Sequence, residues 1–348
     1  MTTSQIAAYG SWKSPLSVQS LVVKMVRLGE IVSDGPDIYW SELRPSEGGR
    51  VVVVRRSADG AIGDVTPAPF NVRTRVHEYG GRAFTVHDGV VYFSNFADQR
   101  LYAQRIGEQP RPLTADRGGP LWRYGDGIID AERGRMICIR EDHSEPDKEA
   151  SNTVVAVDLA TGDNTVLTSG NDFYAAPRLD PSGTRLAWMT WNHPNMPWDD
   201  SELWVAEVAA DGTLGAAKRI AGGTDESVVQ PLWAPDGSLV FASDRSGWWN
   251  LYRWRDGAIT ALAARDAEFA GPLWTLGQAT YGFDSAGRVV CAYSEGGQSR
   301  LARLGDDGQL QAIDIPYTAV GRVLPMGERV LIVAGSPSQL PVLAQVEL

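Results

Sequence analysis

The sequence is poor in cysteine and has no long hydrophobic run. Its two cysteines, Cys138 and Cys291, fall in predicted strands, so we expect buried thiols and no disulfide framework. No apolar window approaches the length of a membrane span, which excludes an integral membrane protein of the helical class. Residues 1–10 show no basic stretch followed by an apolar core, so we expect no secretory signal and a cytoplasmic location.

Several catalytic motifs are also missing. There is no G-x-S-x-G nucleophile elbow, no H-E-x-x-H and no C-x-x-C pair. No glycine-rich phosphate loop follows a strand and opens a helix. The four histidines are spread over the chain, at His77, His87, His143 and His193. We therefore expect no catalytic residue, no metal site and no cofactor within these residues.

The balance of charge argues against two classes of partner. Lys and Arg number 32 and Asp and Glu 43, a formal net charge of −11. Nucleic acids and anionic membrane surfaces carry negative charge, so an acidic protein is a poor match for either. We expect neither as a partner.

Turn-forming residues, by contrast, are abundant, with 37 Gly and 20 Pro. Residues 230–252 show their arrangement best. One apolar strand ends at the Pro235–Gly237 turn, a second ends at residues 243–247, and a third begins at Asn250. A fourth follows a hairpin signal at Asp256–Gly257. Four short antiparallel strands in a row are typical of one blade of a β-propeller.

Weaker copies of this pattern recur about every 40 to 55 residues, a range typical of propeller repeats. Each copy has a turn glycine between two apolar runs: Gly35, Gly89, Gly134, Gly183, Gly237, Gly287 and Gly327. We predict an all-β fold, a seven-bladed β-propeller of four-stranded antiparallel blades, over residues 28–348; six blades is the alternative. Residues 1–27 form a separate N-terminal segment, in which Ser14-Pro15 and the apolar residues up to Val23 predict a short helix.

The last blade is shorter than the others. Residues 329–334 and 340–346 predict its second and third strands, and no fourth strand follows. An open sheet edge leaves unpaired backbone groups, which proteins normally avoid. We therefore expect the chain to be continued by a further domain in a longer protein.

Three connections are richer than simple turns require, and binding residues usually lie in such connections. They are residues 75–82, the charged residues 140–149, and residues 191–200, whose two Trp, one Met and two Pro predict a contact surface. Around them the sequence resembles the N-terminal propeller of bacterial prolyl oligopeptidase family serine peptidases, in the dipeptidyl-aminopeptidase and acylaminoacyl-peptidase branch. The matching stretches are residues 9–15, 37–40 with 44–50, 77–81, 140–143, 193–199 and 243–252.

The resemblance implies a function. In that family the propeller precedes an α/β-hydrolase domain with a Ser-Asp-His triad, caps the active site, limits substrate size and contacts the peptide. No position here matches the triad, so the resemblance implies a gating, substrate-filtering and substrate-contacting propeller for short peptides, inactive without its hydrolase partner. We predict that Glu78 binds a peptide α-ammonium group and that Arg82 binds a carbonyl or carboxylate. His193 and Trp198 complete the predicted substrate-binding set.

Two other readings remain open. The chain could be a free-standing propeller that serves as a protein-binding module. Less favoured is a propeller enzyme such as a glycosidase or quinoprotein, because no clear set of paired carboxylates or metal ligands is evident.

Overall fold

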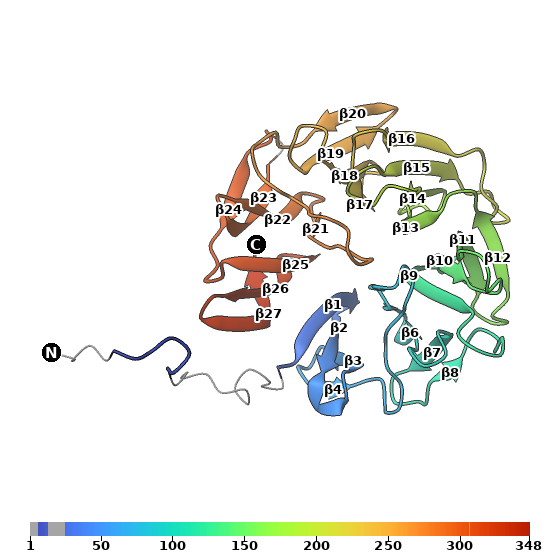
Figure 1. The fold of residues 1–348 in the computed structure, drawn as a ribbon. Coiled ribbons are helices and arrows are strands. Elements are labelled where there is room, and N and C mark those ends of the chain that lie inside the picture. Colours follow the sequence, from blue (N-terminus) through green and yellow to red (C-terminus); the bar gives the residue numbers. More distant parts are fainter. Residues whose placement is uncertain (1–5, 13–24, 306) are drawn as a thin grey trace.

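The computed structural model describes residues 6–12, 25–305 and 307–348. In these residues seven antiparallel sheets stand around a common centre as the blades of a propeller (Figure 1). Neighbouring strands in every sheet are consecutive in the sequence, so each blade is an up-and-down meander. The first strand of a blade lies nearest the centre of the ring and the last lies outermost (Figure 1).

The first four blades each contain four strands. Blade 1 consists of β1 (Arg27–Asp34), β2 (Asp37–Arg44), β3 (Arg50–Arg56) and β4 (Ile62–Asp64), with a 3-10 helix η1 (Pro45–Glu47) after β2. Blade 2 consists of β5 (Phe84–His87), β6 (Val90–Ser94), β7 (Leu101–Arg105) and β8 (Arg111–Pro112). Blade 3 consists of β9 (Trp122–Asp130), β10 (Arg135–Asp142), β11 (Ser151–Asp158) and β12 (Asn164–Thr168). Blade 4 consists of β13 (Phe173–Leu179), β14 (Arg185–Trp191), β15 (Glu202–Glu207) and β16 (Lys218–Gly222).

Of the remaining blades, 5 and 6 contain four strands each, and blade 7 contains three strands in the described residues. Blade 5 consists of β17 (Val228–Trp233), β18 (Leu239–Ser243), β19 (Asn250–Arg255) and β20 (Ala258–Ala261). Blade 6 consists of β21 (Tyr281–Phe283), β22 (Val289–Glu295), β23 (Gln298–Leu304) and β24 (Leu310–Ile313). Blade 7 consists of β25 (Ala319–Met326), β26 (Arg329–Ser336) and β27 (Gln339–Glu347).

The prediction of an all-β propeller with seven blades is confirmed, and the prediction of four strands holds for six of them. Within the described residues, blade 7 has three strands, and β26 and β27 are the two that the sequence predicts. The predicted N-terminal helix falls in residues 13–24, which lie outside the described residues. The described residues 6–12 and 25–26 contain no helix. No helix in the described part of the chain could span a membrane.

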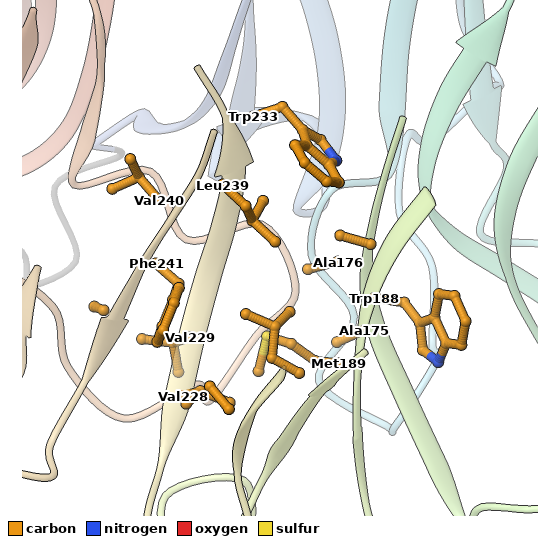
Figure 2. Close-up of a cluster of buried hydrophobic side chains, with 14 of the residues drawn as sticks. Ala175, Ala176, Trp188, Met189, Val228, Val229, Trp233, Leu239, Val240 and Phe241 are labelled. Atoms are coloured by element: carbon orange, nitrogen blue, oxygen red, sulfur yellow. The ribbon is translucent and has the colours of Figure 1, made fainter. Parts of the chain in front are cut away.

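Blades pack face to face through apolar side chains, because a single four-stranded sheet cannot bury both of its faces. Between blades 4 and 5, Met189 of β14 packs in one cluster with Val228 of β17 and Phe241 of β18, all fully buried (Figure 2). Burial of each such side chain contributes about 1.5–3 kcal/mol. Both cysteines are buried within central strands, as predicted, and this burial raises the pKa of both thiols.

Side chains at bulges in the innermost strands connect neighbouring blades around the centre of the ring. Asp126 and Gln230 adopt positive φ values of 53° and 51° where the strand register shifts. Their side chains reach the next blade, where Asp126 accepts the backbone N–H of Ala176 and Gln230 accepts that of Thr280, both at 2.8 Å. These bonds satisfy one backbone N–H group of the next blade each, and they fix neighbouring blades to one another.

The two ends of the ring carry different connections. One end, the turn face, carries the turns between the first and second strands of the blades, such as residues 130–135 and 179–185. The other end, the loop face, carries the connections between second and third strands and those between blades. Arg133 donates to the carbonyl of Gly183, which places the turns of blades 3 and 4 side by side.

The turns of the turn face are anchored by buried aspartates. Asp180, which is buried, accepts the backbone N–H groups of Thr184 and Arg185 at 2.8 and 3.0 Å and pairs with the Arg185 guanidinium at 3.1 Å. Arg185 in turn donates to the carbonyl of Gly237 in the next turn. Burial would raise the pKa of Asp180, but its bonds to these N–H groups and to Ser182 outweigh it and lower the pKa. The carboxylate therefore closes the turn and links it to its neighbour.

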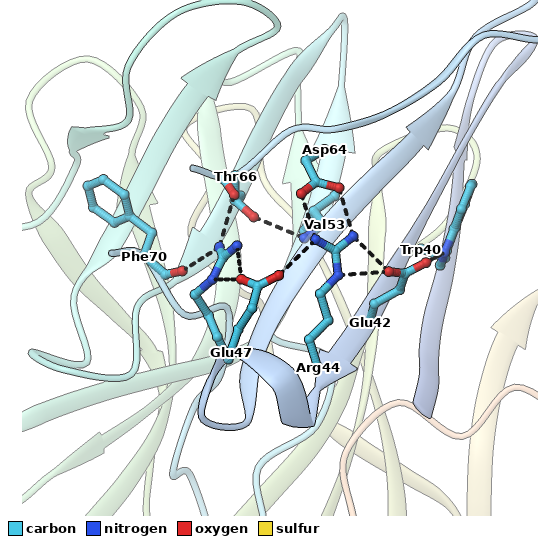
Figure 3. Close-up of polar contacts among 9 residues, drawn as sticks. Trp40, Glu42, Arg44, Glu47, Val53, Asp64, Thr66 and Phe70 are labelled. Carbon is cyan, nitrogen blue, oxygen red and sulfur yellow. Dashed lines mark hydrogen bonds and ion pairs between the residues drawn. The ribbon is translucent and has the colours of Figure 1, made fainter. Parts of the chain in front are cut away.

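On the loop face of blade 1, the hairpin from Arg44 to Arg50 is held by ion pairs (Figure 3). Arg44 lies between Glu42 at 2.7 Å and Asp64 at 2.6 Å, which joins β2 to the outermost strand β4. Arg50 pairs with Glu47 and donates to two backbone carbonyls. This motif of the family resemblance therefore stabilises blade 1.

Candidate functional site

A cavity of about 500 Å³ opens on the loop face. This volume lies in the range typical of sites for small ligands. The connection before blade 2, the connection within blade 3 and the connections before and within blade 4 form most of the wall, and the connection before blade 6 forms the rest. Lining residues come from 77–80, 141–152, 172–173, 191–198 and 273–276.

The connection before blade 2 has an unusual backbone. His77, Glu78 and Arg82 have positive φ values of 53°, 64° and 43°, which non-glycine residues rarely adopt. Backbone strain of this kind persists only where the surroundings enforce it, and it is concentrated at functional sites. The turn directs Glu78 and Tyr79 to the cavity.

Two glycines allow this connection to pack closely. A Cβ atom on Gly80 would lie 2.2 Å from the carbonyl oxygen of Thr74, and one on Gly81 would lie 2.3 Å from that of Leu276. Both have positive φ, of 68° and 100°. Only glycine fits these positions, so the backbone next to Glu78 is fixed from both sides.

Glu78 lies at the cavity rim with its side chain 71% exposed. Arg123 donates to it at 2.7 Å and also to the buried Glu141 at 2.9 Å. The hydrogen bond from Arg123 lowers the pKa of Glu78, so the carboxylate is charged near neutral pH. Glu141 also accepts the backbone N–H of His77 at 2.6 Å, which anchors the strained turn.

His193 contacts two further carboxylates of the cavity. Its Nδ1 lies 3.0 Å from Asp172 and its Nε2 lies 3.6 Å from Glu149. The backbone N–H of His193 lowers the pKa of Asp172. Among the described residues that line the cavity none is Lys or Arg, whereas four are acidic: Glu78, Glu141, Glu149 and Asp172. One arginine outside the lining, Arg123, pairs with two of these carboxylates, so negative charge remains in excess and the site is suited to a cation.

One wall of the cavity is a group of aromatic rings that pack against one another. Phe173 and Trp191 stack at 5.2 Å between ring centroids, and His77 meets both edge-on at 5.3 Å. Burial lowers the pKa of His77 to about 4, so its imidazole is neutral near pH 7. His77 consequently adds no positive charge to the acidic cavity.

Trp198 lies in the cavity together with Glu78, and its side chain is half-buried. Its ring contacts Trp274 at 4.4 Å between centroids, and Trp274 meets Tyr79 at 6.0 Å. Contact of Trp198, His193 and Glu78 with a substrate stays a prediction.

Arg82 lies apart from the cavity, toward the centre of the ring. Its Nε is 3.0 Å from the buried Asp126, which also pairs with Arg178 at 2.8 Å. Burial, together with the neighbouring Arg178, lowers the pKa of Arg82 to about 10. The structure gives Arg82 an internal partner, and its role as a ligand for a carbonyl or carboxylate stays a prediction.

The sequence analysis did not single out the segment that carries Trp274. The connection between β20 and β21 runs inward, and its tip lies near the centre of the ring (Figure 1). Leu276 in this crossing segment (residues 271–278) donates its backbone N–H to Gly80 at 2.8 Å and pairs with Gly81. Arg322 of blade 7 donates to Gly277. The available signal was its length, since long connections without strands are often functional.

The residues that the structure describes contain no group of three or more His, Cys, Asp or Glu side chains placed to hold a metal ion. Three acidic side chains of the cavity, Glu78, Glu141 and Asp172, instead have hydrogen-bond partners from the protein. What the site offers chemically is negative charge beside aromatic surface.

Solved structures of puromycin-hydrolysing enzymes are similar to this chain. A Mycobacterium tuberculosis puromycin-hydrolyzing peptidase is 34% identical with a TM-score of 0.90. Puromycin hydrolase is 35% identical with a TM-score of 0.89, and a mutant of it complexed with PGG is 36% identical with a TM-score of 0.88. Each match covers 98% of this chain and 55% of the other, so the chain spans about half the length of these enzymes. No family model and no curated protein matches the chain.

Proposed function

Because this propeller is homologous to the propeller half of puromycin-hydrolysing peptidases of the prolyl oligopeptidase family, we propose that it forms the substrate-binding and substrate-filtering part of a serine peptidase for short peptides. The observation that carries the proposal is the acidic cavity on the loop face, with Glu78 at its rim. In the homologues the propeller pairs with a hydrolase domain.

The proposed ligand of Glu78 is the α-ammonium group of a peptide. Glu78 is ionised and largely exposed, so an ammonium group can pair with it while both charged groups remain partly hydrated. Asp172 and Glu149 add negative charge to the same cavity. Arg123 lies behind Glu78 and holds its carboxylate in place, which reduces the entropy lost on binding.

Size selection follows from the cavity walls. The crossing segment pairs with Gly80 and Gly81 and closes the cavity toward the centre of the ring. A chain end or a short peptide fits a cavity of about 500 Å³, whereas a folded protein does not. The propeller in this proposal therefore selects substrates by excluding large ones.

Catalysis in this proposal belongs to a hydrolase domain that covers the loop face. Acyl transfer needs an activated nucleophile, a base and an oxyanion site. The 348 residues contain no G-x-S-x-G elbow, so we expect them to hydrolyse no peptide by themselves. Turnover of an aminoacyl anilide by the purified chain, blocked by a fluorophosphonate, would contradict this part of the proposal.

The binding test uses isothermal titration of the chain with alanyl-glycinamide and with its N-acetyl derivative. The two ligands differ in the positive charge that Glu78 is proposed to bind. We expect the free amine to bind and acetylation to weaken binding at least about tenfold, the effect of losing one charged hydrogen bond. Glu78→Gln should remove most of this difference.

Glu132→Gln is the matched control. Glu132 is 73% exposed and lies 3.9 Å from Arg133, but it belongs to the turn face. This variant should bind both ligands as the unmodified chain does. Equal binding of the free and the acetylated ligand, or an equal effect of both substitutions, would overturn the role of Glu78.

A further inference from the structure

The cavity holds two groups of aromatic side chains that differ in how they are packed. The group of Phe173, Trp191 and His77 is closed, because its rings stack on or meet one another. The second group consists of Tyr79, Trp198 and Trp274. Its rings touch only at their edges or at a tilt, and Tyr79 and Trp274 remain 65% and 56% exposed. The second group therefore has free ring surface next to the carboxylates.

The free rings are held in fixed positions. Tyr79 follows the strained Glu78, and Trp274 lies in the crossing segment, which is bonded to Gly80 through Leu276. Leu276 is 3% exposed, so this segment is anchored in the core. Three separate connections thus bring three rings together, and a rigid apolar surface loses little entropy when a ligand docks.

We propose that Tyr79, Trp198 and Trp274 form a shelf that binds the aromatic side chain of a peptide whose ammonium group lies at Glu78. The inference rests on the proposed function and adds the class of substrate, peptides with a free amino terminus and an aromatic residue at or next to it. Trp274 is the specificity-determining residue, because it contacts both other rings of the shelf.

Charge complementarity identifies this occupant. The shelf and the carboxylates line one cavity, so whatever covers the rings also approaches Glu78, Glu149 and Asp172. An uncharged apolar surface of another protein would desolvate these carboxylates, and in the described residues only Glu78 of the three pairs with an arginine, Arg123, so such cover is unfavourable. A cationic ligand with an aromatic ring satisfies both parts. Aromatic rings also attract a nearby ammonium group, which adds to the match.

The test compares three dipeptide amides with a free amino terminus by isothermal titration of the chain. They carry phenylalanine, cyclohexylalanine or alanine as the first residue, followed by glycinamide. Burial of the larger side chain predicts that the phenylalanine ligand binds roughly 10- to 100-fold tighter than the alanine ligand. Ring-to-ring contact predicts that it also binds a few-fold tighter than the cyclohexylalanine ligand.

Substitutions separate the shelf from the ammonium site. Trp274→Leu should abolish the preference for phenylalanine over cyclohexylalanine and leave the binding of the alanine ligand nearly unchanged. The control is Trp248→Leu, because Trp248 is 39% exposed on the same face but does not line the cavity. This variant should keep the full preference.

Each result decides between the two proposals. If the phenylalanine and alanine ligands bind equally, the shelf proposal is wrong while Glu78 keeps its role. If the N-acetylated phenylalanine ligand binds as tightly as the free amine, the shelf remains and the role of Glu78 is wrong. If none of the ligands binds, both proposals are contradicted for this chain, and cover by a hydrolase domain becomes the better account of the shelf.

Discussion

The turn face and the loop face of this propeller are built in opposite ways. On the turn face, buried aspartates such as Asp180 accept several backbone N–H groups, and arginines join the turns of blades 3, 4 and 5 to one another. On the loop face, several connections are long, the backbone at His77 and Glu78 is strained, and aromatic rings remain exposed. The turn face stabilises the ring, and the loop face offers surface for binding. Substitutions should therefore affect stability mainly on one face and binding on the other.

The largest expected effect is the exception to this rule. Gly81→Ala, on the loop face, places a Cβ 2.3 Å from the carbonyl oxygen of Leu276 at a φ of 100°. We expect it to lower the free energy of unfolding by about 2–4 kcal/mol, measured by urea denaturation, and to displace the crossing segment. Gly89→Ala is the control, since Gly89 also has positive φ but has free space around it. It should cost only about 1 kcal/mol, and equal losses would contradict the close packing.

On the turn face, Asp180→Ala should cost about 2–3 kcal/mol, because it removes a buried carboxylate that accepts two backbone N–H groups of the turn and the Nε–H of Arg185. Asp211→Ala is the matched control, as Asp211 also caps a turn, through Thr213, but is exposed. The control should cost under about 1 kcal/mol in the same urea denaturation. A small effect at Asp180 would show that these anchors do not stabilise the ring.

The contribution of Asp180 should also depend on pH. Its pKa is lowered in the folded protein, so its stabilisation is fully present above the unfolded value of about 3.9 and is lost as pH falls through the folded value. The gap in unfolding free energy between the unmodified chain and Asp180→Asn should be constant from pH 7 to about 5 and shrink below about 4. A gap that grows on acidification would contradict the sign of the shift.

The smallest effects on stability are expected where the effects on binding are largest. Glu78→Gln and Trp274→Leu alter exposed side chains of the loop face. The exposed ion pair of Glu78 contributes about 0–1 kcal/mol, and substitutions of exposed side chains usually change the free energy of unfolding by no more than about 0.5 kcal/mol. We therefore expect each variant to unfold within about 0.5 kcal/mol of the unmodified chain. A loss above about 2 kcal/mol in either variant would mean that these side chains stabilise the propeller and would remove the contrast between the faces.

The two faces also explain what could be predicted from the sequence. The number of blades could be predicted from the turn face. In each blade the turn between the first and second strands places a glycine, such as Gly183 or Gly237, at positive φ between two apolar strands. Such signals are local and can be read residue by residue. The loop face supplied several motifs of the family resemblance, including residues 77–81 with Glu78 and residues 193–199 with Trp198.

The long-range contacts of the loop face could not be predicted from the sequence. Trp274 is far from Tyr79 in the chain, and they meet only because the crossing segment runs toward the ring centre and bonds to Gly80. Arg82 follows the cavity loop directly, yet its side chain turns to Asp126. Neither the path of the crossing segment nor the orientation of the Arg82 side chain can be predicted from the spacing of residues in the sequence, because both depend on the closed ring of blades.

Hydrogen exchange with and without a bound peptide tests the central claim most directly. The ligand is phenylalanyl-glycinamide at a saturating concentration, and the readout is exchange of backbone amides by mass spectrometry. We predict slower exchange in residues 75–82, 191–200 and 271–278, with the turns at residues 130–135 and 179–185 unchanged. Protection of the turn face, or no protection of the loop face by bound ligand, would contradict the account.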